Sequence, residues 1–269
     1  MEKKFNGKAI YNPSGKAREY SRWACNFFIG CSNDCTYCYC KKGYLGLMWT
    51  DMPRLKKCFR DTEDAFRIFS SELLRNLDDL RIYGLFFTFT SDPMLSESVP
   101  LTLRCVDWAL DNGVPVQILT KRAEFAHDIR WRQMEPEKRR RVAFGFTLTG
   151  CDDLEPGASS NRERMDAMRL LHDMGYLTFA SIEPVVIPSR SLDCITDVSD
   201  CCDLFKVGLM SGKKDYSISD IKSLFEGIRV IKEKTGSLFY LKDSFVDFLK
   251  LDRNALGESF VNVDYHIFN

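Results

Sequence analysis

The stretch Cys31-Ser-Asn-Asp-Cys35-Thr-Tyr-Cys38 places three cysteines within eight residues, in the spacing C-x3-C-x2-C. Three thiolates on one short loop can bind three irons of a cubane iron–sulfur cluster, which leaves the fourth iron without a protein thiolate. Structural zinc sites instead close their coordination, usually with two C-x2-C pairs or with one such pair and two histidines. The spacing therefore favours a 4Fe-4S cluster held by Cys31, Cys35 and Cys38, with one open iron where a ligand can bind.

A zinc site is the alternative for this stretch. Cys25 and Cys40 flank the three cysteines and could complete a tetrahedral set of ligands. The histidines do not support it, because His127, His172 and His266 are scattered along the chain and none is paired with another in sequence.

Length and charge indicate one globular domain with no overall electrostatic bias. A chain of 269 residues with 45% hydrophobic content can bury one sizeable core, and barrels of this length commonly form a single domain. We expect residues 1–21 to form an N-terminal arm and residues 22–269 to form that domain. The 38 basic and 38 acidic residues balance, so nucleic-acid binding would require a local basic patch.

Cysteine content and the start of the chain indicate a cytoplasmic protein. Eleven cysteines and a polar start, Met1-Glu-Lys-Lys, without an apolar export segment argue for a reducing compartment and against a secreted disulfide scaffold. No apolar run approaches the roughly 20 residues that span a bilayer. We therefore expect a soluble protein without a membrane partner.

Strand-like and helical segments alternate along the chain. The predicted strands are 23–29, 85–90, 114–119, 142–148, 177–182, 203–209 and 238–241, and the predicted helices are 61–80, 99–110, 123–134, 162–174 and 218–234. Gly113, Gly175 and Gly236 follow three of these helices, where a left-handed residue can turn the chain into the next strand. The repeat predicts an α/β fold with a parallel sheet covered by helices on its outer face.

Periodicity alone does not choose between a closed barrel, an open doubly wound sheet and a partial barrel. A doubly wound fold that binds a dinucleotide carries a Gly-rich fingerprint after a strand, and this sequence has none.

The cysteine motif resembles the cluster loop of the radical S-adenosylmethionine (radical SAM) enzymes, and the chain is most similar to the branch around spore photoproduct lyase. The resemblance implies a partial (β/α)6 TIM-type barrel of parallel strands. It also implies that the open iron binds the amino and carboxylate groups of S-adenosylmethionine, which is then cleaved to methionine and a 5′-deoxyadenosyl radical. The similar stretches, which span most of the chain, are residues 12–20, 30–39, 89–93, 118–121, 144–149 and 181–184.

Polar residues recur where the predicted strands end, which is where the active site of a parallel α/β barrel lies. Any one of them could simply begin a loop, since Ser, Thr and Asp are common there. Their recurrence at one end of the sheet favours a binding site. They are Thr90, Ser91, Asp92, Thr120, Lys121, Thr147, Thr149, Ser181, Glu183 and Ser211.

The resemblance gives four residues a role at the methionine end of S-adenosylmethionine. Ser91 and Asp92 stand where the family contacts the amino group. Lys121 matches the Thr-Lys at the end of the third strand and would bind the carboxylate. Arg164 is a second candidate for the carboxylate, although helical arginines are usually solvated.

Three residues have a candidate role at the nucleoside end. Tyr37 matches the family's aromatic residue beside the adenine, and Thr147 matches a polar position that binds the ribose. Glu183 could accept a hydrogen bond from the ribose or could cap the turn at Pro184.

Candidate catalytic residues lie beside the cluster and beyond the fourth strand. Tyr37 and Tyr39 straddle Cys38 like the two tyrosines of the spore photoproduct lyases, which are implicated in relaying a hydrogen atom or electron. Cys151 follows the fourth strand and could reach a substrate. Phe89 departs from the lyases, because it stands where they carry a hydrogen-donor cysteine, and direct thymine-dimer reversal by that route is therefore not expected.

These observations predict a radical SAM enzyme whose 5′-deoxyadenosyl radical abstracts hydrogen from an unknown substrate. The expected cofactors are a 4Fe-4S cluster and S-adenosyl-L-methionine, and the expected electron donor is a reductant such as flavodoxin or ferredoxin. A nucleic acid is one candidate substrate, in lesion repair or base modification. The basic segments 130–132 and 138–141 could bind phosphates, although the negative charges of Glu135 and Glu137 partly offset their positive charge.

Two alternatives are left open. The radical could modify a peptide or a small molecule instead of a nucleic acid. Alternatively, Cys31, Cys35 and Cys38 could bind a metal that only stabilises the fold of a non-catalytic nucleic-acid-binding module. A structural metal site does not need the polar residues at the strand ends, such as Ser91 and Lys121, and this favours the enzyme.

Overall fold

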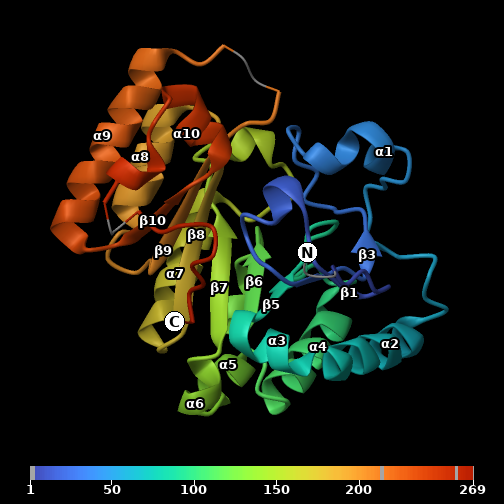
Figure 1. Cartoon of the computed structure of the whole chain (residues 1–269). Coiled ribbons are helices and arrows are strands. Elements are labelled where there is room, and N and C mark those ends of the chain that lie inside the picture. Colours follow the sequence, from blue (N-terminus) through green and yellow to red (C-terminus); the bar gives the residue numbers. More distant parts are fainter. Residues whose placement is uncertain (1–3, 213–214, 258–259, 269) are drawn as a thin grey trace.

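The structure, a computed structural model, describes residues 4–212, 215–257 and 260–268. Its centre is a sheet in the order β1-β2-β5-β6-β7-β8-β9-β10 (Figure 1), and a two-stranded sheet of β3 and β4 lies beside it. The strands are β1 Ile10–Tyr11, β2 Ala24–Cys25, β3 Phe28–Ile29, β4 Arg54–Leu55, β5 Leu85–Phe87, β6 Val116–Thr120, β7 Val142–Thr147, β8 Leu177–Val185, β9 Leu204–Leu209 and β10 Leu238–Leu241.

The main sheet is a partial barrel. From β2 through β10 every neighbouring pair of its strands is parallel, and only β1 pairs antiparallel, with β2. Over the described ranges the two edge strands, β1 and β10, do not pair with each other, so the barrel stays open. This confirms the α/β partial-barrel fold expected from the alternation and the resemblance.

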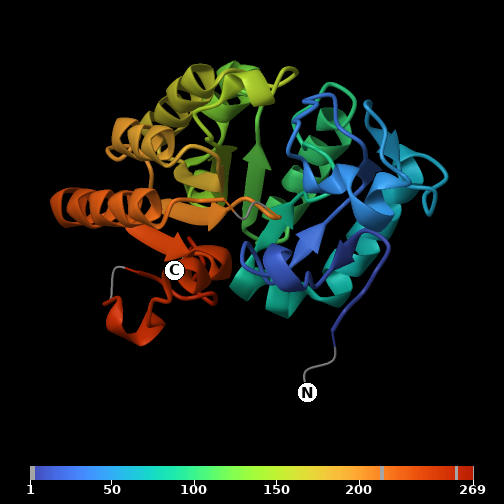
Figure 2. The same ribbon diagram turned by 90° about the horizontal axis from the view of Figure 1, so that it is seen from above.

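Helices cover the outer face of the barrel, and Figure 2 looks from above with the helices around the strands. The connections between consecutive parallel strands run through these helices, as parallel pairing requires. They are α1 Gly43–Gly46, α2 Thr62–Arg75, α3 Leu77–Tyr83, α4 Val99–Asp111, α5 Ile129–Gln133, α6 Pro136–Arg139, α7 Asn161–Asp173, α8 Pro188–Asp197, α9 Ile218–Thr235 and α10 Asp243–Leu249, with 3-10 turns at Gly15–Ala17, Tyr39–Lys41, Glu124–His127, Asp152–Leu154 and Arg253–Ala255.

Local signals in the sequence set the ends of several helices. Ser160 and Glu163 form a reciprocal capping box at the start of α7, which satisfies two backbone N–H groups that have no partner within the helix. Helix α9 ends at Gly236, whose φ of 73° lies in the left-handed region that a side chain disfavours. The predicted glycine stop of this helix is thus confirmed.

The strands bury both faces. Their outward side chains pack under the helices, while alternate residues point into the barrel and form a second, smaller cluster that includes Phe86, Ala143 and Phe179. Gly145 makes room for this inner layer, because a Cβ there would lie 2.1 Å from the Phe179 ring.

Side chains that bond to the backbone interrupt two of the predicted elements. The strand expected at 23–29 is two short strands, β2 and β3. Between them Asn26 donates to the Tyr11 hydroxyl (2.7 Å) and accepts from the Phe89 N–H (2.7 Å). The helix expected at 61–80 is broken at Asn76, whose side chain donates to the Glu72 carbonyl (2.7 Å) and competes with the helical pattern.

Two other differences concern helices. The helix expected at 123–134 is a 3-10 turn followed by α5, because the Asp128 side chain accepts from the Arg130 N–H and starts a new helix. Helices α8 and α10 were not predicted; both are short and α8 begins at Pro188. No helix in the described ranges combines the length and the apolar character needed to cross a membrane.

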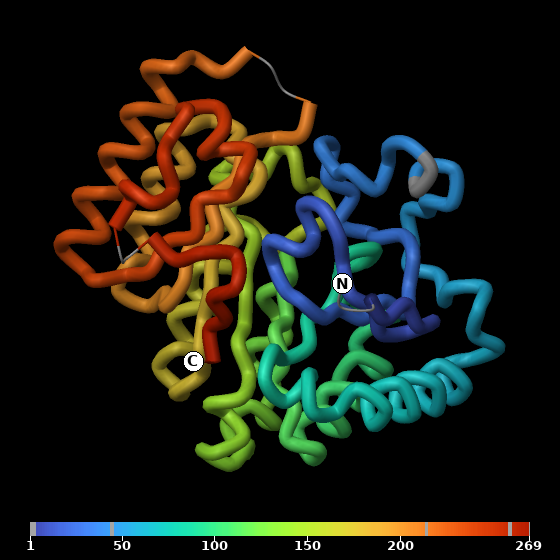
Figure 3. The backbone as a smooth tube through the Cα atoms, viewed as in Figure 1, coloured from blue at the N-terminus to red at the C-terminus, as the bar shows by residue number. Residues whose placement is uncertain are grey.

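The N-terminal segment crosses the open side of the barrel. Its strand β1 joins one edge of the sheet, and residues 16–20 reach the other edge, where Lys206 Nζ donates to the Tyr20 carbonyl (2.7 Å) and Lys242 Nζ to the Lys16 carbonyl (3.3 Å). Figure 3 shows this segment in deep blue approaching the red C-terminal chain, and Arg18 forms an ion pair there with Asp264 (2.8 Å). Residues 1–3 of the expected arm lie outside the described ranges.

Candidate active site

A cavity of about 330 Å³ opens at the carboxyl ends of the parallel strands, between the cysteine loop and the N-terminal segment. Ten of the predicted site residues line it. They are Cys31, Cys35, Tyr37, Cys38, Tyr39, Ser91, Asp92, Lys121, Thr147 and Glu183.

The cysteine loop is held in place by the loop that follows β7. The Thr36 N–H donates to the Leu154 carbonyl (2.9 Å), and the Gly157 N–H donates to the Asn33 carbonyl (3.1 Å). The approach at Gly157 is so close that a Cβ there would lie 1.9 Å from the Ser32 carbonyl oxygen. The two loops therefore fix each other through their backbones.

The three cysteines of the motif are free thiols; Cys35 is buried, and Cys31 and Cys38 are half-buried. The interaction with Cys40 lowers the pKa of Cys38, while burial raises the pKa of Cys31 to about 12. Cys38 is thus the thiol most readily available as a thiolate, the form that binds metal.

The arrangement of possible ligands does not suit a single metal ion. Among the described residues, no three His, Cys, Asp or Glu side chains are grouped so that they could hold one ion. A tetrahedral zinc site requires four ligands around one point, whereas in a cubane cluster each thiolate binds a different iron. Three free thiols on one loop match the number of irons that protein thiolates would hold in a cubane cluster with one open iron.

Asp92 ties the cysteine loop to two strand ends. Its carboxylate accepts hydrogen bonds from the Thr120 hydroxyl (2.6 Å), the Lys121 N–H (2.8 Å), the Met94 N–H (2.9 Å) and the Asn33 amide (2.7 Å). The side chain is only 6% exposed. Because four protein donors already surround its oxygens, Asp92 is arranged to position its neighbours.

Several polar groups at the cavity have no protein partner. Ser91 Oγ, Asn33 Oδ1 and Trp49 Nε1 are buried without a hydrogen bond within the described part of the chain, and all three residues line the cavity. Buried polar atoms are rarely left unpaired, since an unmade hydrogen bond costs about 1–3 kcal/mol. The cavity is therefore arranged for a polar ligand that would satisfy them.

Lys121 provides a cation for that ligand. Its ammonium has no hydrogen bond or ion pair to any described residue and lies 5.6 Å from the centre of the Tyr37 ring. Burial acts to lower the pKa of Lys121, but the nearby Cys35 and Glu155 outweigh it, and the pKa is raised. The side chain is thus charged and available.

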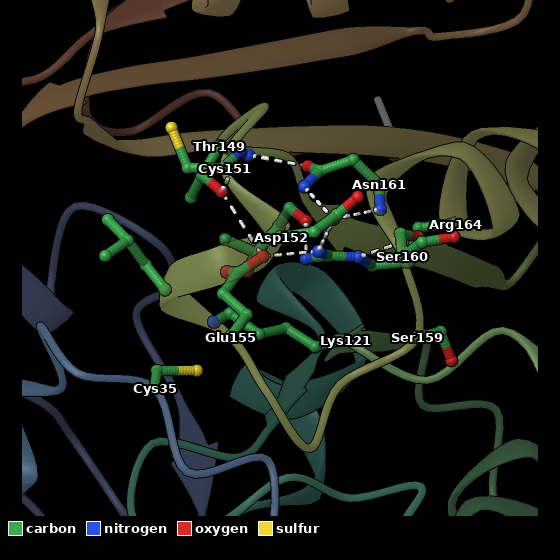
Figure 4. Close-up of polar contacts among 12 residues, drawn as sticks. Cys35, Lys121, Thr149, Cys151, Asp152, Glu155, Ser159, Ser160, Asn161 and Arg164 are labelled. Carbon is green, nitrogen blue, oxygen red and sulfur yellow. Dashed lines mark hydrogen bonds and ion pairs between the residues drawn. The ribbon is translucent and has the colours of Figure 1, made fainter.

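Tyr37 is anchored by the buried ion pair of Glu155 and Arg164, and Figure 4 shows the two partners of this pair. Its hydroxyl donates to Glu155, whose other carboxylate oxygen pairs with Arg164. The side chains of Glu155 and Arg164 are both 0% exposed, and Arg164 also donates to the Thr147 carbonyl (2.5 Å). Removing one partner of such a pair typically costs about 3–5 kcal/mol. The pair therefore fixes both Tyr37 and the end of β7.

Two of the residues with a predicted role lie outside the cavity, and so does the strand-end residue Thr149. Arg164 is occupied by its ion pair with Glu155 and does not line the cavity, so it is not placed to bind a carboxylate there. Cys151 is buried, its sulfur accepts a hydrogen bond from Arg190 (3.7 Å), and Figure 4 shows it pointing away from Cys35 and Lys121.

Aromatic side chains form much of the cavity wall. Phe89 stacks on Phe86 with ring centres 4.5 Å apart and meets the edge of Tyr20 at 6.0 Å. Tyr39 is 54% exposed, while its hydroxyl points inward and donates to the Phe89 carbonyl. The aromatic residues that line the cavity are Tyr20, Tyr37, Tyr39, Trp49 and Phe89.

The far end of the cavity holds a buried polar group around Tyr20. The Tyr20 hydroxyl lies 2.6 Å from Ser181 Oγ and donates to Glu183 (2.8 Å), and Lys242 donates to the same Glu183 oxygen (2.6 Å). Burial, together with the Lys242 ammonium, lowers the pKa of Lys206 beneath Tyr20 to about 7. The hydrogen bonds from Tyr20 and Lys242 hold the Glu183 carboxylate at the edge of the cavity, where it is partly exposed.

Tyr20, Asn33, Trp49 and Lys242 are among the residues of the cavity that were not predicted. Lys242 could have been found, because it directly follows a predicted strand in the same way as Lys121. Asn33 lies inside the cysteine motif, but nothing in its spacing distinguishes it from the neighbouring loop residues. Tyr20 and Trp49 reach the cavity only through the tertiary fold.

Comparison of the sequence with known proteins finds a distant relative. No family model matches the chain. An uncharacterized protein of Methanocaldococcus jannaschii is 26% identical over 178 residues, which cover 62% of this chain and 61% of that protein. The match thus spans about three fifths of the length of that relative.

Two solved structures have a similar architecture. Spore photoproduct lyase complexed with a dinucleoside spore photoproduct matches with a TM-score of 0.63 and 16% identity, over 86% of this chain and 79% of that chain. Streptococcus suis SuiB bound to S-adenosylmethionine matches with a TM-score of 0.51 and 12% identity, over 83% of this chain and 52% of that chain. The chain therefore has the partial-barrel fold of these proteins, and the lyase is the better structural match of the two.

Proposed function

We propose that this chain is a radical SAM enzyme that carries a 4Fe-4S cluster on Cys31, Cys35 and Cys38. One observation carries the proposal: one cavity is lined by the three cysteines, by Lys121, whose ammonium has no partner within residues 4–212, 215–257 and 260–268, and by Ser91 and Asn33, whose side-chain oxygens have none there. When bound, the cluster supplies the electron that cleaves S-adenosylmethionine to methionine and a 5′-deoxyadenosyl radical.

The residues around the cysteine loop suit the methionine end of S-adenosylmethionine. Lys121 binds the carboxylate, and Ser91 and Asn33 accept hydrogen bonds from the amino group. Asp92 acts indirectly, because it holds the Asn33 amide and the Lys121 backbone in place. An amino acid moiety would thus find acceptors for its ammonium and a cation for its carboxylate in the same cavity.

The nucleoside end is bound by residues on the next strands. Tyr37 packs against the adenine with its ring held by the bond to Glu155. Thr147, whose hydroxyl has no partner among the described residues, binds the ribose from the end of β7, and Glu183 does so from the end of β8. Burial and the Glu155 carboxylate raise the pKa of Tyr37, so its hydroxyl keeps its proton while it holds the ring.

The substrate that best suits the remaining space is one with a planar ring, such as a base of a nucleic acid. Tyr20, Tyr39, Trp49 and Phe89 offer faces and edges on which a flat ring can stack. The match to spore photoproduct lyase complexed with a dinucleoside spore photoproduct agrees with this class. Base extrusion from a duplex would cost a few kcal/mol.

The basic segments 130–132 and 138–141 do not line the cavity. Residues 130–141 form α5, α6 and the turn after them, at the end of the barrel opposite the cavity (Figure 1). Arg130 and Lys138 are paired there with Asp107 and Asp111. The argument for a base therefore depends on the cavity wall and not on this segment.

Anaerobically reconstituted protein should convert S-adenosylmethionine to 5′-deoxyadenosine and methionine in equal amounts when a low-potential reductant is added. Cleavage needs only the cluster and S-adenosylmethionine, so product should form slowly even without a substrate. Liquid chromatography with mass detection measures both products. An oligonucleotide substrate should raise the yield, whereas a short peptide should not. Intact S-adenosylmethionine after incubation with protein of full iron and sulfide content would refute the proposal.

A further inference from the structure

The segment after the cysteine motif carries an excess of positive charge. Residues 41–60 contain six basic residues and one acidic residue, although the whole chain balances 38 of each. Lys42, Arg54 and Lys57 are exposed, and their side chains have no hydrogen bond or ion pair to any residue that the structure describes. The other three are occupied: Lys41 with Asp34, Arg60 with Asp64, and Lys56 with the Lys8 carbonyl.

The same segment exposes apolar side chains. Leu47 is 83% exposed, Met52 50% and Met48 43%, and Tyr39 stands at the start of the segment with 54%. Methionine and tyrosine are enriched at protein interfaces, and methionine adapts readily to different partners. We call Tyr39, Lys42, Leu47, Met48, Met52, Arg54 and Lys57 the 39–57 patch.

The patch lies directly against the cysteine loop. The Cys31 N–H donates to the Thr50 carbonyl (3.2 Å), and β3 pairs with β4 so that Ile29 stands opposite Arg54. A Cβ at Gly30 would lie 2.5 Å from the Met52 carbonyl oxygen, so nothing fits between the two segments. Figures 1 and 2 show α1 and this segment at the outer side of the barrel mouth, away from α8 and α9.

We propose that the 39–57 patch is the docking surface for a small acidic electron-carrier protein with a flavin or an iron–sulfur centre. The proposal rests on the proposed function, in which the cluster needs an electron. The step transfers one electron: the reduced carrier is oxidised by one electron, the cluster is reduced by one, and no bond is made or broken. Docking here brings the carrier's redox centre to the segment that directly contacts the cysteine loop.

The chemistry of the patch favours a protein over a nucleic acid. Electron-transfer complexes are transient and small, below about 1,200 Å² of buried surface, and charge complementarity steers their association. An acidic carrier would pair with Lys42, Arg54 and Lys57 and would also cover Leu47 and Met48. A phosphate backbone would use the charges and leave these apolar side chains exposed.

The test compares two double variants with the same change of charge. In the patch variant, Lys42→Glu is combined with Lys57→Glu. In the control variant, Arg132→Glu is combined with Arg140→Glu, at exposed positions near α5 and α6 at the other end of the barrel. Stopped-flow absorbance follows the bleaching of the oxidised cluster after mixing with reduced flavodoxin, and dithionite serves as a small reductant that needs no docking surface.

The patch variant should be reduced by flavodoxin about ten times more slowly than the parent at low salt, because electrostatic steering raises association rates by factors of 10 to 10³. The difference should shrink as salt screens the charges. Dithionite should reduce all three proteins equally fast, and the control variant should match the parent with flavodoxin. Leu47→Glu should slow the flavodoxin reaction in the same way.

Two results would overturn the docking surface and leave the proposed function standing. One is equal flavodoxin rates in the parent and the patch variant; the other is equal slowing in both double variants. Loss of single-stranded DNA binding in the patch variant, with unchanged flavodoxin rates, would assign the patch to nucleic acid. A parent protein without any cluster that dithionite can reduce would overturn the docking surface and the proposed function together.

Discussion

Cys35→Ala should abolish formation of 5′-deoxyadenosine and should leave the purified protein with little iron and sulfide. Cys35 is the central thiol of the motif and is buried against the Lys121 side of the cavity. With only two thiolates remaining, the loop can no longer hold three irons of a cubane cluster. Iron and sulfide analysis and product chromatography, both on anaerobically prepared protein, measure the effect.

Cys58→Ala is the matched control for that variant. Cys58 is an exposed cysteine that does not line the cavity, so its variant should keep about four irons and four sulfides per chain. Wild-type rates of cleavage in Cys35→Ala would show that the three cysteines are not the ligands of the catalytic cluster.

Lys121→Met should weaken the affinity for S-adenosylmethionine by about ten- to a hundredfold while the cluster survives. The lost interaction is a hydrogen bond to a charged group in a partly dry cavity, worth about 1.5–3 kcal/mol. Arg164 should not compensate, because its guanidinium is buried in the ion pair with Glu155. Equilibrium binding of S-adenosylmethionine to fully clustered protein measures the loss.

Lys234→Met is the control here, since Lys234 is exposed near the end of α9 and does not line the cavity. Its affinity for S-adenosylmethionine should equal that of the parent. The same equality in Lys121→Met would mean that another group binds the carboxylate and that the ammonium of Lys121 has a different partner.

The fold was largely predictable because its signals are local. Apolar strands alternate with amphipathic helices, and Gly236 ends α9 in the left-handed conformation that the sequence indicated. The breaks were not predictable. Asn26 interrupts its strand through side-chain hydrogen bonds to Tyr11 and Phe89, and these partners are known only once the chain is folded. Asn76 interrupts its helix through a local hydrogen bond to the Glu72 carbonyl, and the helical pattern of the sequence continues past this point.

The cavity shows the same division between local and tertiary information. The spacing of the cysteines and the polar ends of the strands led to twelve residues that line the cavity. The positive charge of Arg164 suits a carboxylate ligand, but in the folded chain Arg164 pairs with the buried Glu155 from the loop before α7. Asn33 and Trp49 each carry a buried polar atom without a partner in the part of the chain that the structure describes, and only the three-dimensional arrangement reveals this.

Electron paramagnetic resonance of the reduced protein, recorded with and without S-adenosylmethionine, tests the central claim most directly. A cluster on Cys31, Cys35 and Cys38 has an open iron, so the protein should give the signal of a reduced 4Fe-4S cluster, and S-adenosylmethionine should change that signal by binding to this iron. No cluster signal, or a signal that S-adenosylmethionine leaves unchanged at saturating concentration, would contradict the account.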